Sequence, residues 1–374
     1  MLWKKCGGVG IRYQIFPNRF ELTKNYSQIK KNLGDNKKDI ISVFFSIEGC
    51  HVFNNIGLKS IIPAHGVLNN IQTVKEWDYP PLYVSMAHHI NNDLCGHAKS
   101  LSGLLGIIIN QKKGLDQGFT KLGEEVLHKL LKEEPRRIYI DIKHMNVKSR
   151  IEYYDILDRD YKGKCIPVLV SHGAVSGRKL IKPWKGEEFN TEDINFFDDE
   201  IIKIHCSGGF LGIQLDERRL CPITQERSKR WRINRAERLS CHSKFVWNQI
   251  CHIAEVLDDK GLFGWGTATI GSDYDGIVDS LNGYWTSDYF GIFEENLLIH
   301  ASKYLKANPL KNHPDNNPID PEEVINRFMR DNALQFLENF YKDDVSIVKN
   351  QEKDTLCEEV GMKEWGIALK DYLG

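Results

Sequence analysis

The segment RRIYIDIKHMN (Arg136–Asn146) has the pattern of a buried β-strand that ends in polar residues. Its apolar stretch, Ile138–Ile142, fits a strand covered on both faces, and Lys143 and His144 follow at the carboxyl end. Parallel α/β barrels carry their catalytic groups at that end of their strands. Because a polar strand end can also be a solvated boundary, the other strands have to distinguish a functional histidine from a surface one.

Seven short runs of strand character alternate with longer amphipathic segments along the chain. These runs are Val9–Ile15, Ile41–Ile47, Leu82–Ala87, Ile138–Ile142, Pro167–Ser171, Phe210–Leu215 and Thr267–Gly271. Among the helical segments, Lys121–Glu134 carries its apolar residues on one face, and Asp320–Tyr341 starts with an N-cap aspartate followed by proline. Strands that alternate with helices predict an α/β fold with a parallel sheet.

Composition restricts the partners and the compartment that we expect. A formal net charge of -1 provides no positive field for nucleic acid, so no nucleic-acid partner is expected. Nine cysteines at irregular spacings favour reduced thiols and a cytoplasmic location over a disulfide framework. The longest apolar runs are far shorter than the roughly 20 residues that span a bilayer, and the first ten residues contain no apolar signal-peptide core.

Carboxylates or imidazoles follow five of the seven predicted strands. In chain order they are Glu48, the pair His88 and His89, His144, His172, and the pair Asp273 and Asp275. In a closed barrel the carboxyl ends of the strands meet at one mouth. One carboxylate, two histidines and an aspartate at that mouth are a ligand set expected for zinc or a similar metal ion. The combined pattern predicts a metal or catalytic site that includes His144.

These segments resemble those of the membrane (renal) dipeptidases, metal-dependent hydrolases of the amidohydrolase superfamily, over most of the chain. IEGCH is similar to the family segment whose glutamate bridges two zinc ions, which implies that role for Glu48. YIDIKHMN and PVLVSHG resemble the strand pair that supplies two histidine ligands, here His144 and His172. YVSMAH implies that His88 contacts the scissile carbonyl of the substrate, and IGSDYDG implies that Asp273 handles the proton of the catalytic water.

The resemblance implies a single TIM-type (β/α)₈ barrel over residues 1–374 that lacks the first strand of the family. GGVG (Gly7–Gly10) resembles the second strand, and the family's His-x-Asp pair, which helps to bind one of two zinc ions, has no counterpart before Glu48. We therefore expect one intact zinc site per chain. The apolar Val345–Val348 is the late candidate for the remaining strand position.

Two features leave the substrate open. The family arginine that binds the substrate carboxylate has no counterpart at its expected place, and Arg178 is a candidate substitute. Asp216–Arg219 stands where the dipeptidases have a tyrosine. The expected function is zinc-dependent hydrolysis of dipeptides or related small amides by a metal-activated water. The alternatives are an amidohydrolase for another amide or a lactam, and a catalytically impaired barrel that serves as a binding module. Homodimer formation also stays open.

Overall fold

The computed structural model describes residues 19–34, 40–53, 64–101, 111–177, 189–222 and 234–342, together with Cys357. The predicted strand Val9–Ile15, the late candidate Val345–Val348 and the candidate substrate residue Arg178 lie outside the described residues.

The described strands are parallel and form three groups. They are β1 (Arg19–Leu22) with β2 (Ile40–Val43); β3 (Ile47–Glu48), β4 (Tyr83–Ser85) and β5 (Tyr139–Asp141); and β6 (Val170–Gly173), β7 (Leu211–Ile213) and β8 (Ala268–Ile270). A parallel bridge between Asp141 and Leu169 connects β5 to β6. Strand pairing therefore runs from β3 to β8, whereas no ladder joins β8 to β3 in the described part of the chain. The predicted α/β fold with parallel sheets is confirmed, and a closed barrel is not seen among these residues.

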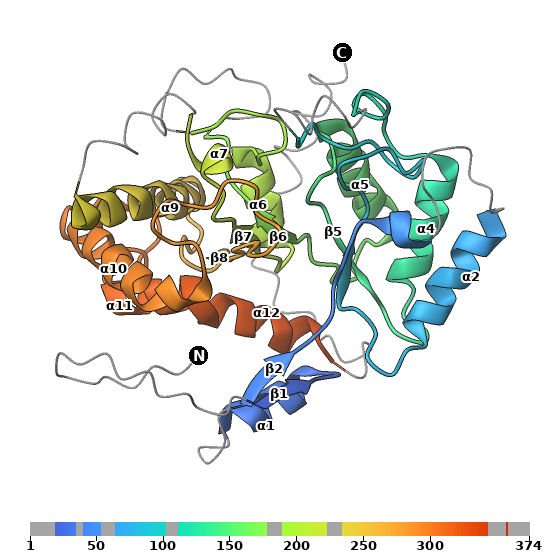
Figure 1. The fold of residues 1–374 in the computed structure, drawn as a ribbon, viewed down its shortest axis with the longest axis horizontal. Coiled ribbons are helices and arrows are strands. Elements are labelled where there is room, and N and C mark those ends of the chain that lie inside the picture. The colour runs from blue at the N-terminus through green and yellow to red at the C-terminus, as the bar shows by residue number, and fades with distance from the viewer. Residues whose placement is uncertain are drawn as a thin grey trace.

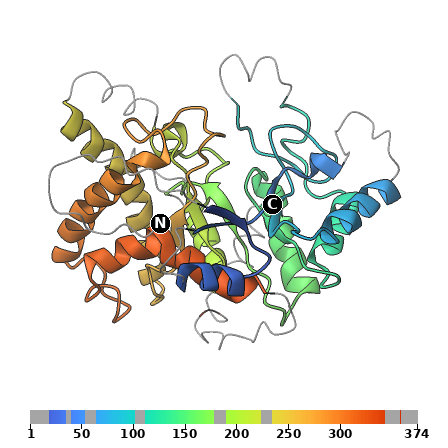
Figure 2. The same cartoon turned by 60° about the horizontal axis from the view of Figure 1, so that its bottom comes forward.

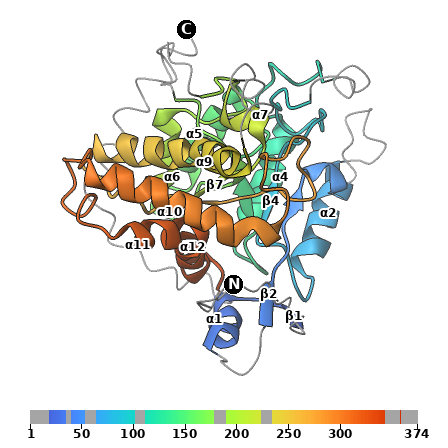
Figure 3. The same ribbon diagram turned by 60° about the vertical axis from the view of Figure 1, so that its left-hand side comes forward.

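The helices surround the strands in two groups. The helical elements are α1 (Tyr26–Gly34), η1 (Cys50–Phe53), α2 (Ala64–Lys75), α4 (Lys121–Leu131), α5 (Val147–Asp160), α6 (Asp198–Cys206), α7 (Glu217–Leu220), α9 (Arg235–Asp258), η2 (Ser287–Tyr289), α10 (Phe290–Lys306), α11 (Pro321–Asn326), η3 (Arg327–Asp331) and α12 (Asn332–Phe340). Figure 1 shows α2, α4 and α5 on the side of β5, and α9 to α11 on the opposite side. In Figure 2, α1 and α12 lie in front of the strands, and in Figure 3 the long helices α9 and α10 lie side by side.

Most of the predicted elements form, with differences that depend on tertiary contacts. The predicted strand Ile41–Ile47 is divided into β2 and β3, and β1 was not predicted, because its residues are mostly exposed and include two charges. Asp320 caps α11 before Pro321 as expected, since its side chain accepts a hydrogen bond from the backbone N–H of Glu322. The predicted helix continues only through the π-helical turn η3 into α12.

The apolar core consists of two clusters. The larger one lies between the strands and the surrounding helices. The smaller one joins residues at the amino ends of strands, such as Leu82 and Leu169, to Phe336, Leu337 and Phe340 of α12. Helix α12 therefore covers the end of the strands that lies opposite the predicted site.

The expectation that all cysteines are reduced is wrong for one pair. Cys206, at the end of α6, forms a disulfide with Cys357, and their Cα atoms are 5.3 Å apart. The other described cysteines are free; they are Cys50, Cys95, Cys165, Cys221, Cys241 and Cys251. A separation of 151 residues gives the sequence no local signal for this pair. Within the described part of the chain, no helix has the length and apolar character to span a membrane.

Candidate metal centre

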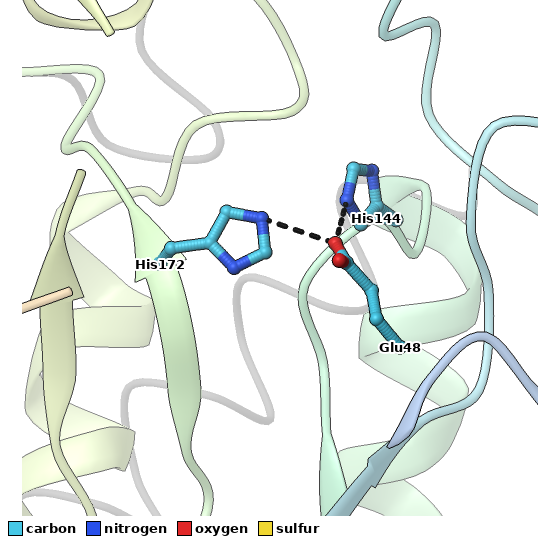
Figure 4. A group of neighbouring side chains, drawn as sticks. All are labelled: Glu48, His144 and His172. Carbon is cyan, nitrogen blue, oxygen red and sulfur yellow. Dashed lines mark hydrogen bonds and ion pairs between the residues drawn. The ribbon is translucent and has the colours of Figure 1, made fainter. Parts of the chain in front are cut away.

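Three of the predicted site residues come together at the carboxyl ends of neighbouring strands (Figure 4). Glu48 ends β3, His144 follows β5, and His172 belongs to β6. The Nε2 atoms of His144 and His172 lie 3.0 and 3.3 Å from the same Oε1 atom of Glu48. One donor atom from each of the three residues lies within 4.8 Å of the other two. The fold therefore assembles the predicted ligand set.

Two turns with positive φ support this geometry. His144 has a φ of 67°, a left-handed conformation that costs a non-glycine residue about 1–3 kcal/mol and is found mostly where the surroundings hold it. The carbonyl of His144 accepts a hydrogen bond from the backbone of Ala98 at 2.7 Å, which helps to hold this turn. Gly49, next to Glu48, has a φ of 101°, and a Cβ there would lie only 2.4 Å from the ring of His51. Position 49 therefore requires glycine.

Burial keeps the two histidines neutral. It lowers the pKa of His144 well below its usual value, and burial followed by the charge of Lys143 lowers the pKa of His172 to about 3. Burial alone would raise the pKa of Glu48, but hydrogen bonds from His144 and His88 and the influence of His172 outweigh it and lower that pKa. Two neutral imidazoles and one ionised carboxylate are donors that zinc accepts.

A buried carboxylate orients His172. Asp141 is fully buried, and its Oδ2 accepts hydrogen bonds from the hydroxyls of Ser85 and Ser171, each at 2.6 Å. The Oγ of Ser171 lies 2.9 Å from Nδ1 of His172. Since the hydroxyl hydrogen of Ser171 goes to Asp141, the network assigns the imidazole hydrogen of His172 to Nδ1. The second of the two carboxylates near the ligand segments, Asp275, has no such bond to a ligand among the described contacts.

This tautomer supplies a test of whether a cation fits the site. Nε2 of His172 then directs a lone pair at the ionised Glu48 carboxylate, 3.3 Å away, with no proton between them. Two electron-rich atoms at this separation repel each other unless a positive charge lies between them. The Glu48 side chain is 42% exposed, so an ion can reach it from solvent. The three residues therefore fit a divalent metal ion.

Asp273 follows β8, on the opposite side of His172 from Asp141's own strand. Its Oδ2 lies 3.9 Å from Nε2 of His172. Burial, and then the charge of Glu48, raise the pKa of Asp273 to about 6. A carboxyl group with a pKa in this range is suited to exchange protons near neutral pH.

His88 lies at the same carboxylate, and it has imidazole neighbours. Its Nε2 lies 3.4 Å from Oε1 of Glu48, and its ring centroid lies 4.6 Å from that of His144. The rings of His51 and His89 lie 5.9 and 3.8 Å from the His88 ring. Burial, and then the charge of His88, lower the pKa of His89 to about 4. No role was predicted for His51 or His89, although each directly adjoins a predicted segment.

Lys143 is a buried cation that the sequence pattern marked only as a polar strand end. It is 1% exposed, and its Nζ donates to Oε1 of Gln214, just beyond β7, at 2.8 Å. Burial, and then the charge of Arg219, lower the pKa of Lys143 to about 7. The lysine therefore connects the ends of β5 and β7 beneath the site.

The two arginines after β7 have carboxylate partners. Arg218 donates from Nε to Oδ1 of Asp216 at 2.9 Å. Arg219 forms an ion pair with Glu192 and donates from an Nη atom to the carbonyl of Ser100 at 2.6 Å. These contacts bind the loop after β7 to the neighbouring loops.

A cavity of about 390 Å³ adjoins the metal centre. Glu48, His172 and Asp273 line one end of it. The cavity extends between β3 and β8 to Phe336 and Leu337 of α12. It therefore connects the site to the second apolar cluster.

Comparison with known proteins shows a likeness at the level of fold. No protein-family model matches the sequence, and no curated protein matches it either. A metallopeptidase from Rhodobacter sphaeroides, solved with a phosphinate mimic of the dipeptide L-Ala-D-Ala, is 14% identical with a TM-score of 0.52, over 86% of this chain and 69% of that chain. The dipeptidase AC, a metallopeptidase of family M19, is also 14% identical, with a TM-score of 0.53 over 86% and 72% of the two chains. The chain thus has the fold of dipeptidase-like metallopeptidases.

Proposed function

We propose that this protein is a zinc-dependent hydrolase that cleaves dipeptides or related small amides with a metal-activated water. One observation carries the proposal: the Nε2 atoms of His144 and His172 converge on one carboxylate oxygen of Glu48. A zinc ion held by these three side chains would supply a Lewis acid that polarises the amide carbonyl and lowers the pKa of water from about 15.7 towards 7.

The remaining residues have distinct tasks in this proposal. Asp273 accepts a proton from the attacking water and passes it to the leaving amine, for which a pKa of about 6 is suitable. His88 donates a hydrogen bond to the carbonyl oxygen as negative charge develops on it. Asp141 and Ser171 keep the hydrogen of His172 on Nδ1, so that Nε2 remains a metal donor. Arg178 remains the candidate for binding the substrate carboxylate.

A combined metal and activity assay tests the proposal. The protein is loaded with zinc and assayed on dipeptides, dipeptides that contain D-residues, and N-acyl amino acids, before and after chelation. We expect about one zinc per chain, and turnover that chelation removes and added zinc restores. His172→Ala should lose both the zinc and the turnover. His128→Ala is a matched control, because His128 lies on α4 and contacts Tyr161 rather than the site. A protein with full zinc content and no turnover on the panel would replace the hydrolase by a metal-binding module.

A further inference from the structure

We propose that the amide substrate carries an apolar acyl tail, as in an N-acyl amino acid of medium chain length, and that this tail occupies the cavity between β3 and β8. The inference rests on the proposed function and adds a substrate class to it. A cavity of about 390 Å³ lies within the range of roughly 300–1,000 Å³ that is common for small-molecule sites.

The lining of the cavity changes from polar to apolar along its length. At one end are Glu48, His172 and Asp273, which carry the proposed chemistry. At the other end are aromatic and aliphatic side chains, among them Phe210 and Phe336. The rings of these two phenylalanines meet edge to face with centroids 4.7 Å apart, so they form a wall. A molecule that matches this lining has a carbonyl group at one end and an apolar chain beyond it.

The missing strand pairing explains why this space is open. Where neighbouring strands pair, as from β3 through β8, their inward side chains pack against one another. Between β8 and β3 no ladder is present in the described part of the chain, and the lining there includes small residues such as Gly271 and Ala333. The apolar core is divided into two clusters, and residues of both line the cavity.

The charges around the cavity decide which part of the substrate enters it. No lysine or arginine is among the described residues that line it. The nearby cations have partners elsewhere, since Lys143 donates to Gln214 and Arg219 pairs with Glu192. A free carboxylate or ammonium group in the apolar end would be desolvated without a partner, which is strongly unfavourable. The acyl chain therefore points inward, and the amino-acid carboxylate stays at the open mouth.

Chain length provides the quantitative test. Each methylene group that leaves water for an apolar cavity strengthens binding by about fourfold, until the cavity is full. Binding is measured by calorimetry on chelated protein, where no hydrolysis occurs, with N-acetylglycine, N-hexanoylglycine and N-decanoylglycine. We expect affinity to rise steeply from acetyl to hexanoyl and then to level off. Equal affinity for all three acylglycines would overturn the inference.

Variants of α12 locate the tail. Ala333→Trp fills the cavity from the helix side and should remove the gain from chain length, while leaving the weak binding of N-acetylglycine unchanged. Ala333→Leu is a milder version in case the larger ring prevents folding, and it should shift the plateau to shorter chains. Gln335→Trp is the matched control, because residue 335 is exposed on the same helix. If the Ala333 variants fold and keep the full chain-length dependence, the tail does not lie in this cavity.

The zinc-loaded protein separates this inference from the proposed function. Turnover of dipeptides or N-acetylglycine without any preference for longer acyl chains would retain the hydrolase and overturn the apolar tail. Chain-length-dependent binding to the chelated protein without turnover by the zinc-loaded protein would overturn the hydrolase, and with it the acyl amide as a substrate.

Discussion

Two junctions between strands, the one from β5 to β6 and the one from β8 to β3, differ in how they are filled. At the first, Asp141 bridges to Leu169 and accepts hydrogen bonds from the hydroxyls and backbone of neighbouring strands. At the second, no ladder is present among the described residues, and a cavity of about 390 Å³ lies there. The three candidate ligands all belong to the paired run from β3 to β6, whereas Asp273 stands on β8. The fold thus holds the proposed metal on its connected side and leaves room for a substrate on the other.

The largest expected effect tests whether the two sides act together. Asp273→Asn removes a proton acceptor from the open side without touching the ligands, so zinc content should stay unchanged. Turnover should fall by about 10²–10⁴-fold, the usual contribution of a positioned general base. The measurements are zinc content by metal analysis and kcat on the best substrate of the panel. A loss of zinc in this variant would show that Asp273 binds the metal, which would erase the division between the two junctions.

Matched truncations compare how tightly the two junctions are packed. Leu169, at the β5–β6 junction, is 0% exposed, whereas Leu337 lines the cavity and is 8% exposed. Leu169→Ala should lower the free energy of unfolding by about 4 kcal/mol, because its surroundings cannot relax into the space. Leu337→Ala should cost about 2 kcal/mol, since this side chain already lacks neighbours on one side. Urea unfolding of both variants decides the order, and equal costs would contradict the difference in packing.

A tautomer change gives the smallest effect that we expect. In Asp141→Asn, an amide N–H replaces the Oδ2 acceptor and donates to the oxygen of Ser171. The Ser171 hydroxyl then donates to Nδ1 of His172, and the ring hydrogen moves to Nε2, where it blocks metal binding. Zinc affinity should fall by about 10–100-fold, as is typical for partners of metal-binding histidines.

Competition with a zinc chelator measures the affinity of this variant. Asp116→Asn is the control, because Asp116 is an exposed residue of the loop before α4. An unchanged affinity in Asp141→Asn would mean that the junction does not control the tautomer of His172.

The sequence could predict the features that depend on local pattern. The strands that precede His144, His172 and Asp273 are short apolar runs with polar ends, and the structure places their ends together. That the three donors of Glu48, His144 and His172 hold zinc stays a prediction. The sequence could not predict β1, whose residues are mostly exposed, because exposed strands lack the alternation that burial imposes.

Other features depend on contacts between distant segments. The Asp141 network uses serines on two other strands, and the cavity results from strand pairing that is absent between β8 and β3 in the described residues. The disulfide joins Cys206 to Cys357 across 151 residues. None of these has a signal within a short window of sequence, so each became visible only in three dimensions.

The π-helical turn η3 (Arg327–Asp331) makes the length of the last helices as important as their composition. Such a turn amounts to one extra residue within an α-helix. Its neighbour Asn332 donates to the backbone carbonyl of Ala268 in β8 at 2.8 Å, which fixes where α12 starts. Deleting one residue from η3 would rotate α12 by about 100° relative to α11 and turn Phe336 and Phe340 away from the second apolar cluster. Substitutions in this turn should therefore be tolerated far better over evolution than a single-codon deletion.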